Sequence, residues 1–112
     1  MSGGTFDYRQ YMLEDIAEQI DTAIMHNDDP LGDTWEKPGG MHLRPDTLAR
    51  MALAAATCRL AQAMATRVDY LLAGDDGEDS FHERWRENVE PLACAMMKAA
   101  EAMAAELRKA GR

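Results

Sequence analysis

The segment from Pro45 to Ala73 constrains the fold of this chain more than any other sequence feature. It contains no internal proline or glycine, and Gly74 follows it directly. Proline suits the first position of a helix and glycine its end, so the segment predicts one helix about 43 Å long. Eight alanines between positions 49 and 65 leave little side-chain bulk on any side. Because small residues let helices approach closely, we expect this helix to be central and contacted on two faces.

A second helical pattern covers residues 8–26, before this segment. Its apolar residues recur every four positions, which is the spacing of one face of a helix. The stripe consists of Tyr8, Met12, Ile16, Ile20 and Ile24. The acidic residues Glu14, Glu18 and Asp21 fall on the opposite side of the predicted helix, which we expect to face water.

The third helical pattern begins after the acidic turn at residues 74–79. Ser80 followed by Glu83 fits a capping box. Apolar residues then recur at alternating spacings of three and four, as in a coiled-coil seam built from Ala and Met. The seam residues are Trp85, Val89, Leu92, Met96, Ala99, Met103 and Leu107. Pro91 interrupts this run and predicts a kink.

The remaining residues predict how the helices start and how they are connected. Asp7 followed by Gln10 fits a capping pattern for a first helix that starts at residue 8. Residues 27–44 contain turn-forming Asn, Asp, Pro and Gly without any periodic pattern, which predicts a long loop. We expect Trp35 and Met41 to hold this loop against the helices.

Composition and charge exclude several classes of protein. The 112 residues are 46% hydrophobic and 29% charged, which is typical of a globular protein and predicts a single helical domain over residues 1–112. Twelve Lys and Arg against twenty Asp and Glu give a net charge of −8, which argues against direct binding to nucleic acids. No stretch approaches the ~20 apolar residues of a membrane span, and no signal-peptide pattern is visible, so we expect a cytoplasmic protein.

These patterns together predict an all-α fold, a three-helix up-down-up bundle with a kinked third helix and a long loop between the first two helices. This topology places the start of the first helix, the end of the second and the start of the third at one end of the bundle. Six of the seven aromatic residues fall in these three segments, and Trp35 is the exception. The Ala and Met seam of the third helix also indicates a homo-oligomer.

Aromatic rings and arginines at this shared end predict a binding site. Aromatic rings stack on planar ligands, arginines bind phosphates or carboxylates, and helix N-termini favour anions. We therefore expect a pocket for a small anionic, nucleotide-like ligand. Its predicted residues are Tyr8, Tyr11, Arg67, Tyr70, Phe81, His82, Arg84 and Arg86. In the alternative interpretation, the rings only close the end of the bundle and the arginines pair with the acidic turn at 74–79.

Two stretches of the sequence resemble a known family. The first is Ser2-Gly3-Gly4-Thr5-Phe6-Asp7-Tyr8, with Gln10-Tyr11 and Asp15-Ile16-Ala17-Glu18. The second is Arg67-Val68-Asp69-Tyr70-Leu71-Leu72-Ala73-Gly74-Asp75-Asp76-Gly77-Glu78, with Ser80-Phe81-His82-Glu83-Arg84. Together they are similar to the signatures of a family of small phage- and prophage-associated proteins. The resemblance implies a phage or mobile-element setting rather than an activity. For such a setting we hypothesise that the protein counteracts a host defence.

We expect the function to be non-enzymatic binding, without a metal or cofactor, because the His and Cys residues lack zinc-site spacing. In one version the protein sequesters the nucleotide-like ligand. In the other it docks on a basic surface of a host protein through Glu14, Glu18 and Asp21, together with the acidic turn at residues 75–79. One alternative is an all-α nucleoside triphosphate pyrophosphohydrolase of the MazG type, since Glu14, Asp15 and Glu18 have the spacing of its Mg²⁺ ligands, although the second acidic pair is missing. Another alternative is a helical oligomerisation or adaptor protein.

Overall fold

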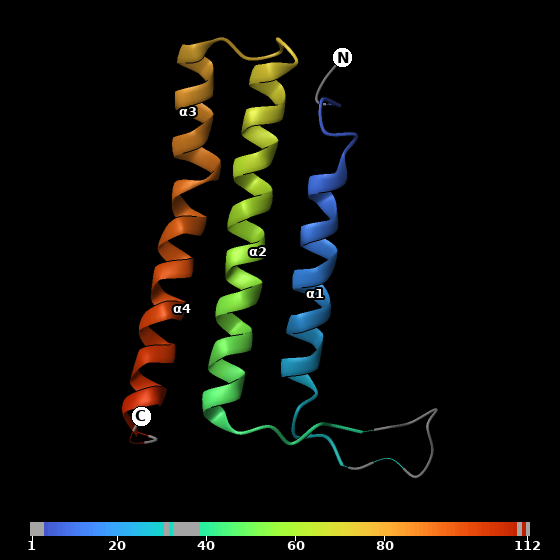
Figure 1. The fold of residues 1–112 in the computed structure, drawn as a ribbon, viewed down its shortest axis with the longest axis vertical. Coiled ribbons are helices and arrows are strands. Elements are labelled where there is room, and N and C mark those ends of the chain that lie inside the picture. The colour runs from blue at the N-terminus through green and yellow to red at the C-terminus, as the bar shows by residue number, and fades with distance from the viewer. Residues whose placement is uncertain (1–3, 31, 33–38, 110, 112) are drawn as a thin grey trace.

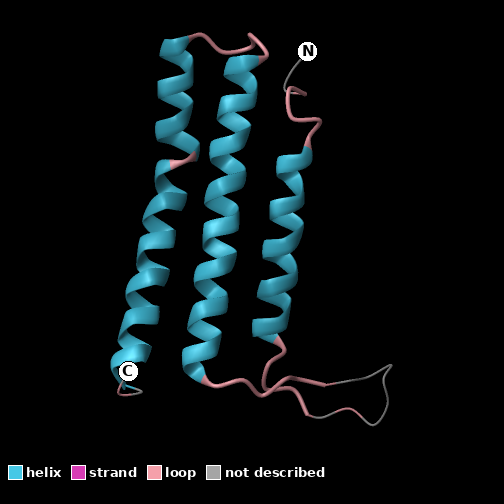
Figure 2. Ribbon diagram, viewed as in Figure 1, coloured by secondary structure: helices cyan, strands magenta, loops and turns pink. Residues whose placement is uncertain are grey.

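The computed structural model describes residues 4–30, 32, 39–109 and 111, and all structural statements concern these residues. The elements are the 3-10 helix η1 (Arg9–Tyr11) and the α-helices α1 (Met12–Met25), α2 (Pro45–Leu72), α3 (Glu78–Asn88) and α4 (Glu90–Lys109). The described part of the chain contains no strand (Figure 2), so the predicted all-α class is confirmed. None of the described helices combines the length and the apolar character that a membrane span requires.

The Ala-rich helix α2 lies in the middle of the molecule. Figure 1 shows α1 on one side of α2 and the helix formed by α3 and α4 on the other. Within the described ranges, α2 contacts all the other helices, whereas neither η1 nor α1 contacts α3 or α4. The prediction of a central helix with neighbours on two faces is therefore confirmed. The helices form a layer rather than a closed triangular core, and the molecule measures 18 Å along its shortest axis.

The fully buried apolar side chains of this layer are few and small. Among the described residues they are Ala17, Ala55, Ala63 and Val89. The alanines allow close packing of α1, α2 and α4, as expected for small residues between helices. No described Leu, Ile, Met or aromatic side chain is fully buried. The layer therefore lacks a core of large side chains.

The first helix begins later than the sequence pattern predicts. Asp7 and Tyr8 have positive φ angles of 54° and 57°, which lie outside the right-handed helical region. η1 follows, and α1 begins at Met12. The prediction that Asp7 and Gln10 cap a helix at Tyr8 is wrong, because the Gln10 side chain donates a hydrogen bond to Asp69 of α2 instead.

The turn between α2 and α3 follows the predicted glycine stop. α2 ends at Leu72, and Gly74 has a φ of 83°, which a residue without a Cβ adopts at little cost. α3 begins at Glu78 with Gly77 as its N-cap, so the prediction that Ser80 precedes the helix is wrong. The Ser80 hydroxyl accepts a hydrogen bond from the Gly77 N–H at 3.1 Å, which places Ser80 in the first turn of α3.

The third helix is bent where α3 meets α4, at Val89 (Figure 2). Pro91 has no N–H to donate to the carbonyl of Glu87, and its ring crowds that carbonyl, so the helical hydrogen bonding is interrupted. The kink predicted from Pro91 is confirmed. Val89 is 2% exposed and is the largest fully buried apolar side chain described. The bend therefore coincides with the largest buried apolar side chain of the layer.

The two ends of the loop between α1 and α2 are fastened to each other. The Asn27 side chain is 2% exposed and accepts a hydrogen bond from the Leu43 N–H at 2.8 Å. Gly40 lies so close to Asn27 that a Cβ on it would collide with the Asn27 carbonyl oxygen. Of the two residues expected to hold the loop on the helices, Trp35 lies outside the described residues. Met41 is 67% exposed, so its predicted packing is wrong.

Candidate functional site

Three charged residues meet where α2 ends and α3 begins. Arg67 of α2 and Arg84 of α3 both approach the carboxylate of Asp76, in the turn between these helices. Arg67 Nη1 lies 3.6 Å from Asp76 Oδ2, and Arg84 Nε lies 3.7 Å from Asp76 Oδ1. The side chains of Arg67 and Asp76 are almost buried, whereas that of Arg84 is 55% exposed. Two guanidinium groups therefore share one carboxylate.

Backbone hydrogen bonds in the turn after α2 position Asp76. The carbonyl of Tyr70 accepts hydrogen bonds from the N–H groups of Asp75 at 2.9 Å and of Asp76 at 3.2 Å. The chain can turn back in this way because Gly74 adopts a left-handed conformation. Asp76 Oδ2 is buried and accepts no hydrogen bond in the described part of the structure. This oxygen instead faces the guanidinium of Arg67 at 3.6 Å, a distance of an ion pair that is too long for a hydrogen bond.

A pocket of about 350 Å³ opens at this cluster. Its lining residues are Arg67, Tyr70, Asp75, Asp76 and Arg84. The Cζ atom of Arg67 lies 4.7 Å from the centroid of the Tyr70 ring, which is a cation–π contact. This contact and its burial fix Arg67, while the exposed Arg84 remains accessible to a ligand. The volume lies at the lower end of the range of small-molecule sites.

Five of the eight predicted ligand-binding residues do not line this pocket. They are Tyr8, Tyr11, Phe81, His82 and Arg86. The rings of Tyr8 and Tyr11 stack with their centroids 6.3 Å apart. Because η1 and α1 have no contact with α3 in the described ranges, α2 separates this stack from Arg84. The Phe81 and His82 rings meet edge to face within α3, with centroids 5.4 Å apart.

Asp69 of α2 holds the start of the chain, a role that the sequence patterns do not reveal. It is 1% exposed and accepts hydrogen bonds from the Gly4 N–H at 3.0 Å, the Thr5 N–H at 2.7 Å and the Gln10 side chain at 3.1 Å. Three donors explain how a carboxylate is accommodated in a buried position. The available sequence signal was a lone acid among the apolar residues near the end of the second helix.

Two of the three predicted partner-binding acids pair with Arg59 of α2. Arg59 Nη1 lies 2.6 Å from Asp21 Oδ2, and Arg59 Nε lies 3.3 Å from Glu14 Oε1. The hydrogen bond to Asp21 is the main cause that raises the pKa of Arg59, and burial opposes it. The expectation that all three acids lie on the water-facing side of the helix is confirmed in full only for Glu18, which is exposed. Glu14 and Asp21 reach Arg59 of α2, while their side chains remain 40% and 45% exposed.

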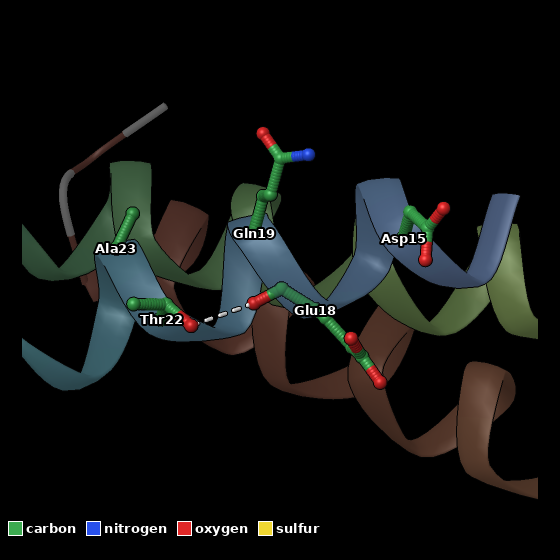
Figure 3. A pocket seen from close by; sticks show the side chains of 5 residues that line it. All are labelled: Asp15, Glu18, Gln19, Thr22 and Ala23. Atoms are coloured by element: carbon green, nitrogen blue, oxygen red, sulfur yellow. Dashed lines mark hydrogen bonds between the residues drawn. The ribbon is translucent and has the colours of Figure 1, made fainter. Parts of the chain in front are cut away.

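Figure 3 shows a depression on α1 and the side chains that line it. These side chains are Asp15, Glu18, Gln19, Thr22 and Ala23. The Thr22 hydroxyl donates a hydrogen bond to the Glu18 carbonyl at 2.9 Å. No group of three or more His, Cys, Asp or Glu residues in the described chain is arranged to hold a metal ion. Asp69 of α2 does not line this depression and accepts hydrogen bonds from the start of the chain instead.

Comparisons with known proteins do not indicate a function for the pocket between α2 and α3 or for the depression on α1. No family model matches the chain, and neither a curated protein nor a solved structure matches it. The function therefore has to be argued from this chain's own residues. Among these, Arg67, Asp76 and Arg84 form the cluster best suited to binding a ligand.

Proposed function

We propose that this protein is a non-enzymatic binding protein that holds a small anionic, nucleotide-like ligand in the pocket between α2 and α3. The supporting observation is the sharing of Asp76 by Arg67 and Arg84. Their N···O distances of 3.6 and 3.7 Å exceed the ~2.7–2.9 Å of a closed charge-assisted hydrogen bond. Guanidinium N–H donors therefore remain available for an incoming phosphate.

Each part of the pocket suits one part of such a ligand. The exposed Arg84 meets the phosphate first, and the almost buried Arg67 adds a second positive charge where water screens it less. Tyr70 supplies an aromatic ring beside Arg67.

The geometry supports this version better than two of the other interpretations of the sequence, host-protein docking and the pyrophosphohydrolase. Docking on a host protein through Glu14, Glu18 and Asp21 requires two of these acids to leave Arg59. A pyrophosphohydrolase of the MazG type requires an acidic pair on α2, where Asp69 already accepts three hydrogen bonds. In the phage or mobile-element setting implied by the resemblance, the protein acts in the host cytoplasm by sequestering a nucleotide-like signal of a defence system.

The homo-oligomer expected from the sequence needs a surface other than the Ala and Met seam of the third helix. None of the seven seam residues is exposed. They lie in α3, in α4 and at the bend between them, and both helices pack against α2, so the seam is used within the chain. A second copy has to meet one of the broad faces of the layer.

Calorimetric titration with nucleoside mono-, di- and triphosphates tests the ligand proposal. The wild type is expected to bind at least one member of the panel. Arg84→Gln removes a charged donor from the pocket and is expected to weaken binding about tenfold or more. Arg86→Gln makes the same change two positions along α3, outside the pocket, and is expected to leave the affinity within about twofold. Absence of binding to every nucleotide, or equal weakening by both variants, would refute the proposal.

A further inference from the structure

The molecule is only one helix thick. Its shortest extent is 18 Å, and a single helix with its side chains is about 10–12 Å across. Domains normally consist of at least two packed layers with a core between them. The accessible surface is 7622 Å², against about 6,100 Å² for a compact monomer of 12.4 kDa. The layer therefore leaves open a surface that a second layer would cover.

The two broad faces of this layer differ in chemistry. Arg59 marks one face, because it reaches from α2 to Glu14 and Asp21 of α1. At about 100° per residue, the side of α2 opposite Arg59 carries only apolar residues between positions 54 and 72, apart from Thr57. Its larger members are Met64, Val68 and Leu72. Met64 is 38% exposed and Leu72 is 60% exposed.

The helix α1 extends this apolar side of α2. Ala17 is buried and belongs to the side of α1 that packs on α2. Glu14 lies on the Arg59 side of that contact, so Met12 and Ile16 fall on the other side by helical geometry. Met12 is 63% exposed and Ile16 is 45% exposed.

The helix α4 adds to the same side from the opposite edge of the layer. Asn88 and Leu92 line a groove together with Gln62 and Thr66, which lie on the Arg59 side of α2. Met97 lies about 140° around α4 from Leu92 and is 58% exposed. Three helices thus contribute apolar residues to one side of the layer, although the exposed Glu90 and Glu101 lie beside Met97 on α4. We define this apolar face by Met12, Ile16, Met64, Val68, Leu72 and Met97.

We propose that the apolar face is the contact surface of a homodimer, with a second copy of this chain as its occupant. The 28 residues of α2 are about 42 Å long, and neighbouring helices are spaced by about 9 Å, so the face covers on the order of 800 Å². A standard stable interface buries about 800 Å² per partner. The face is therefore large enough for a stable dimer, and no fully buried core has to open to form it.

A second copy fits because the face is self-complementary. A twofold axis in the interface, perpendicular to α2 near Ala61, sets the two copies of α2 antiparallel. Ala61 then lies at the axis, and Ala54 of one copy faces Val68 of the other, so small residues at these positions allow the helices to approach. Position 50 of one copy faces position 72 of the other. Arg50, which is half exposed, therefore comes near Glu78 and Asp79 at the acidic start of the partner's α3.

Sedimentation equilibrium of the full chain tests the homodimer. The wild type is expected at twice the chain mass of 12.4 kDa. Ala54→Glu places a carboxylate on the apolar face, and Ala52→Glu places the same group on the Arg59 side two positions earlier. Both alanines are exposed, so both variants are expected to retain the helical circular dichroism of the wild type. Ala54→Glu is expected to weaken the dimer about thirtyfold or more, because two unpaired charges would be buried, and Ala52→Glu less than about threefold.

Each outcome of this experiment decides for or against the homodimer. A wild type that stays monomeric in the tens of micromolar range overturns it. Equal weakening by Ala52→Glu and Ala54→Glu overturns the assignment to the apolar face, and an assembly of more than two copies overturns the twofold contact. Where Ala54→Glu loses helicity, Met64→Glu gives the same test at a side chain that is already 38% exposed. Arg84→Gln leaves the dimer intact, so failure of the ligand proposal is distinguished from failure of the dimer.

Discussion

The carboxylate of Asp69 accepts a hydrogen bond of 2.7 Å from the backbone N–H of Thr5, which lies 64 positions earlier in the chain. The Gly4 N–H and the Gln10 side chain donate to the same carboxylate. Hydrogen bonds to an ionised acceptor are stronger than those between neutral groups. The start of the chain is therefore fastened to the end of α2, at the end of the molecule that also carries Asp76.

Replacement of Asp69 tests this attachment. Asp69→Asn removes the charge and can turn an amide donor toward the N–H groups of Gly4 and Thr5. We expect the free energy of unfolding in urea to fall by about 2–3 kcal/mol, the usual cost of breaking a buried charged hydrogen-bond group. Asp79→Asn makes the same change at an exposed position and is expected to alter stability by about 0.5 kcal/mol or less. Equal stability of the two variants would show that the chain start is not held by Asp69.

Structural features that arise from the local backbone were predictable from the sequence. Gly74 ends α2 and Pro91 bends the third helix because each changes the backbone directly where it stands. Asp69 and Asn27 were not predictable in this way, since their roles depend on N–H groups that other segments bring to them. The start of α1 was mispredicted for the same reason: the Gln10 side chain is drawn to α2.

The sequence predicted at which end of the molecule the candidate site lies. It did not predict on which side of α2 each candidate residue lies. The predicted topology places Arg67, Arg84 and Tyr11 at the same end. Helical periodicity does not show that α1 and α3 flank opposite sides of α2, so it does not separate Tyr11 from the arginines. The ligand class stays a prediction that the titration experiment tests. The biological setting also stays a prediction.

The two ends of the loop between α1 and α2 approach each other closely because Gly40 has no side chain. A Cβ there would collide with the Asn27 carbonyl oxygen, so we expect Gly40→Ala to cost about 2 kcal/mol, typical of overpacking. We also expect hydrogen exchange of the Leu43 amide, which donates to Asn27, to accelerate about tenfold or more. Gly77→Ala is the control, because nothing lies within 4 Å of its added Cβ, and it is expected to cost less than about 1 kcal/mol. If hydrogen exchange of the Leu43 amide were unchanged in Gly40→Ala, the two loop ends would not depend on Gly40 for their contact.

The Arg59 ion pairs make a prediction about pH. The hydrogen bond to Asp21 raises the pKa of Arg59 above its ordinary value. A raised pKa gives stability that is fully present below the unfolded-state pKa and is lost only as pH rises through the folded-state value. Arg59→Gln is therefore expected to lower the free energy of unfolding by about 1 kcal/mol or less, equally at pH 6 and pH 9, and by less in high salt. A destabilisation that disappears between these two pH values would rule out this explanation.

Val89 and Leu72 distinguish the stability of the layer from that of the homodimer. Val89 is 2% exposed within one chain, so Val89→Ala is expected to lower the free energy of unfolding by about 2 kcal/mol at every protein concentration.

Leu72 is 60% exposed in one chain and covered in the proposed dimer. Because a dimer is stabilised by mass action, the Tm of the wild type should rise with protein concentration. Leu72→Ala should then match the wild type in dilute solution and unfold at a lower temperature in concentrated solution, as measured by circular dichroism. If the wild-type Tm is independent of concentration and Leu72→Ala has no effect at any concentration, the layer is stable as a monomer and Val89 still belongs to its core.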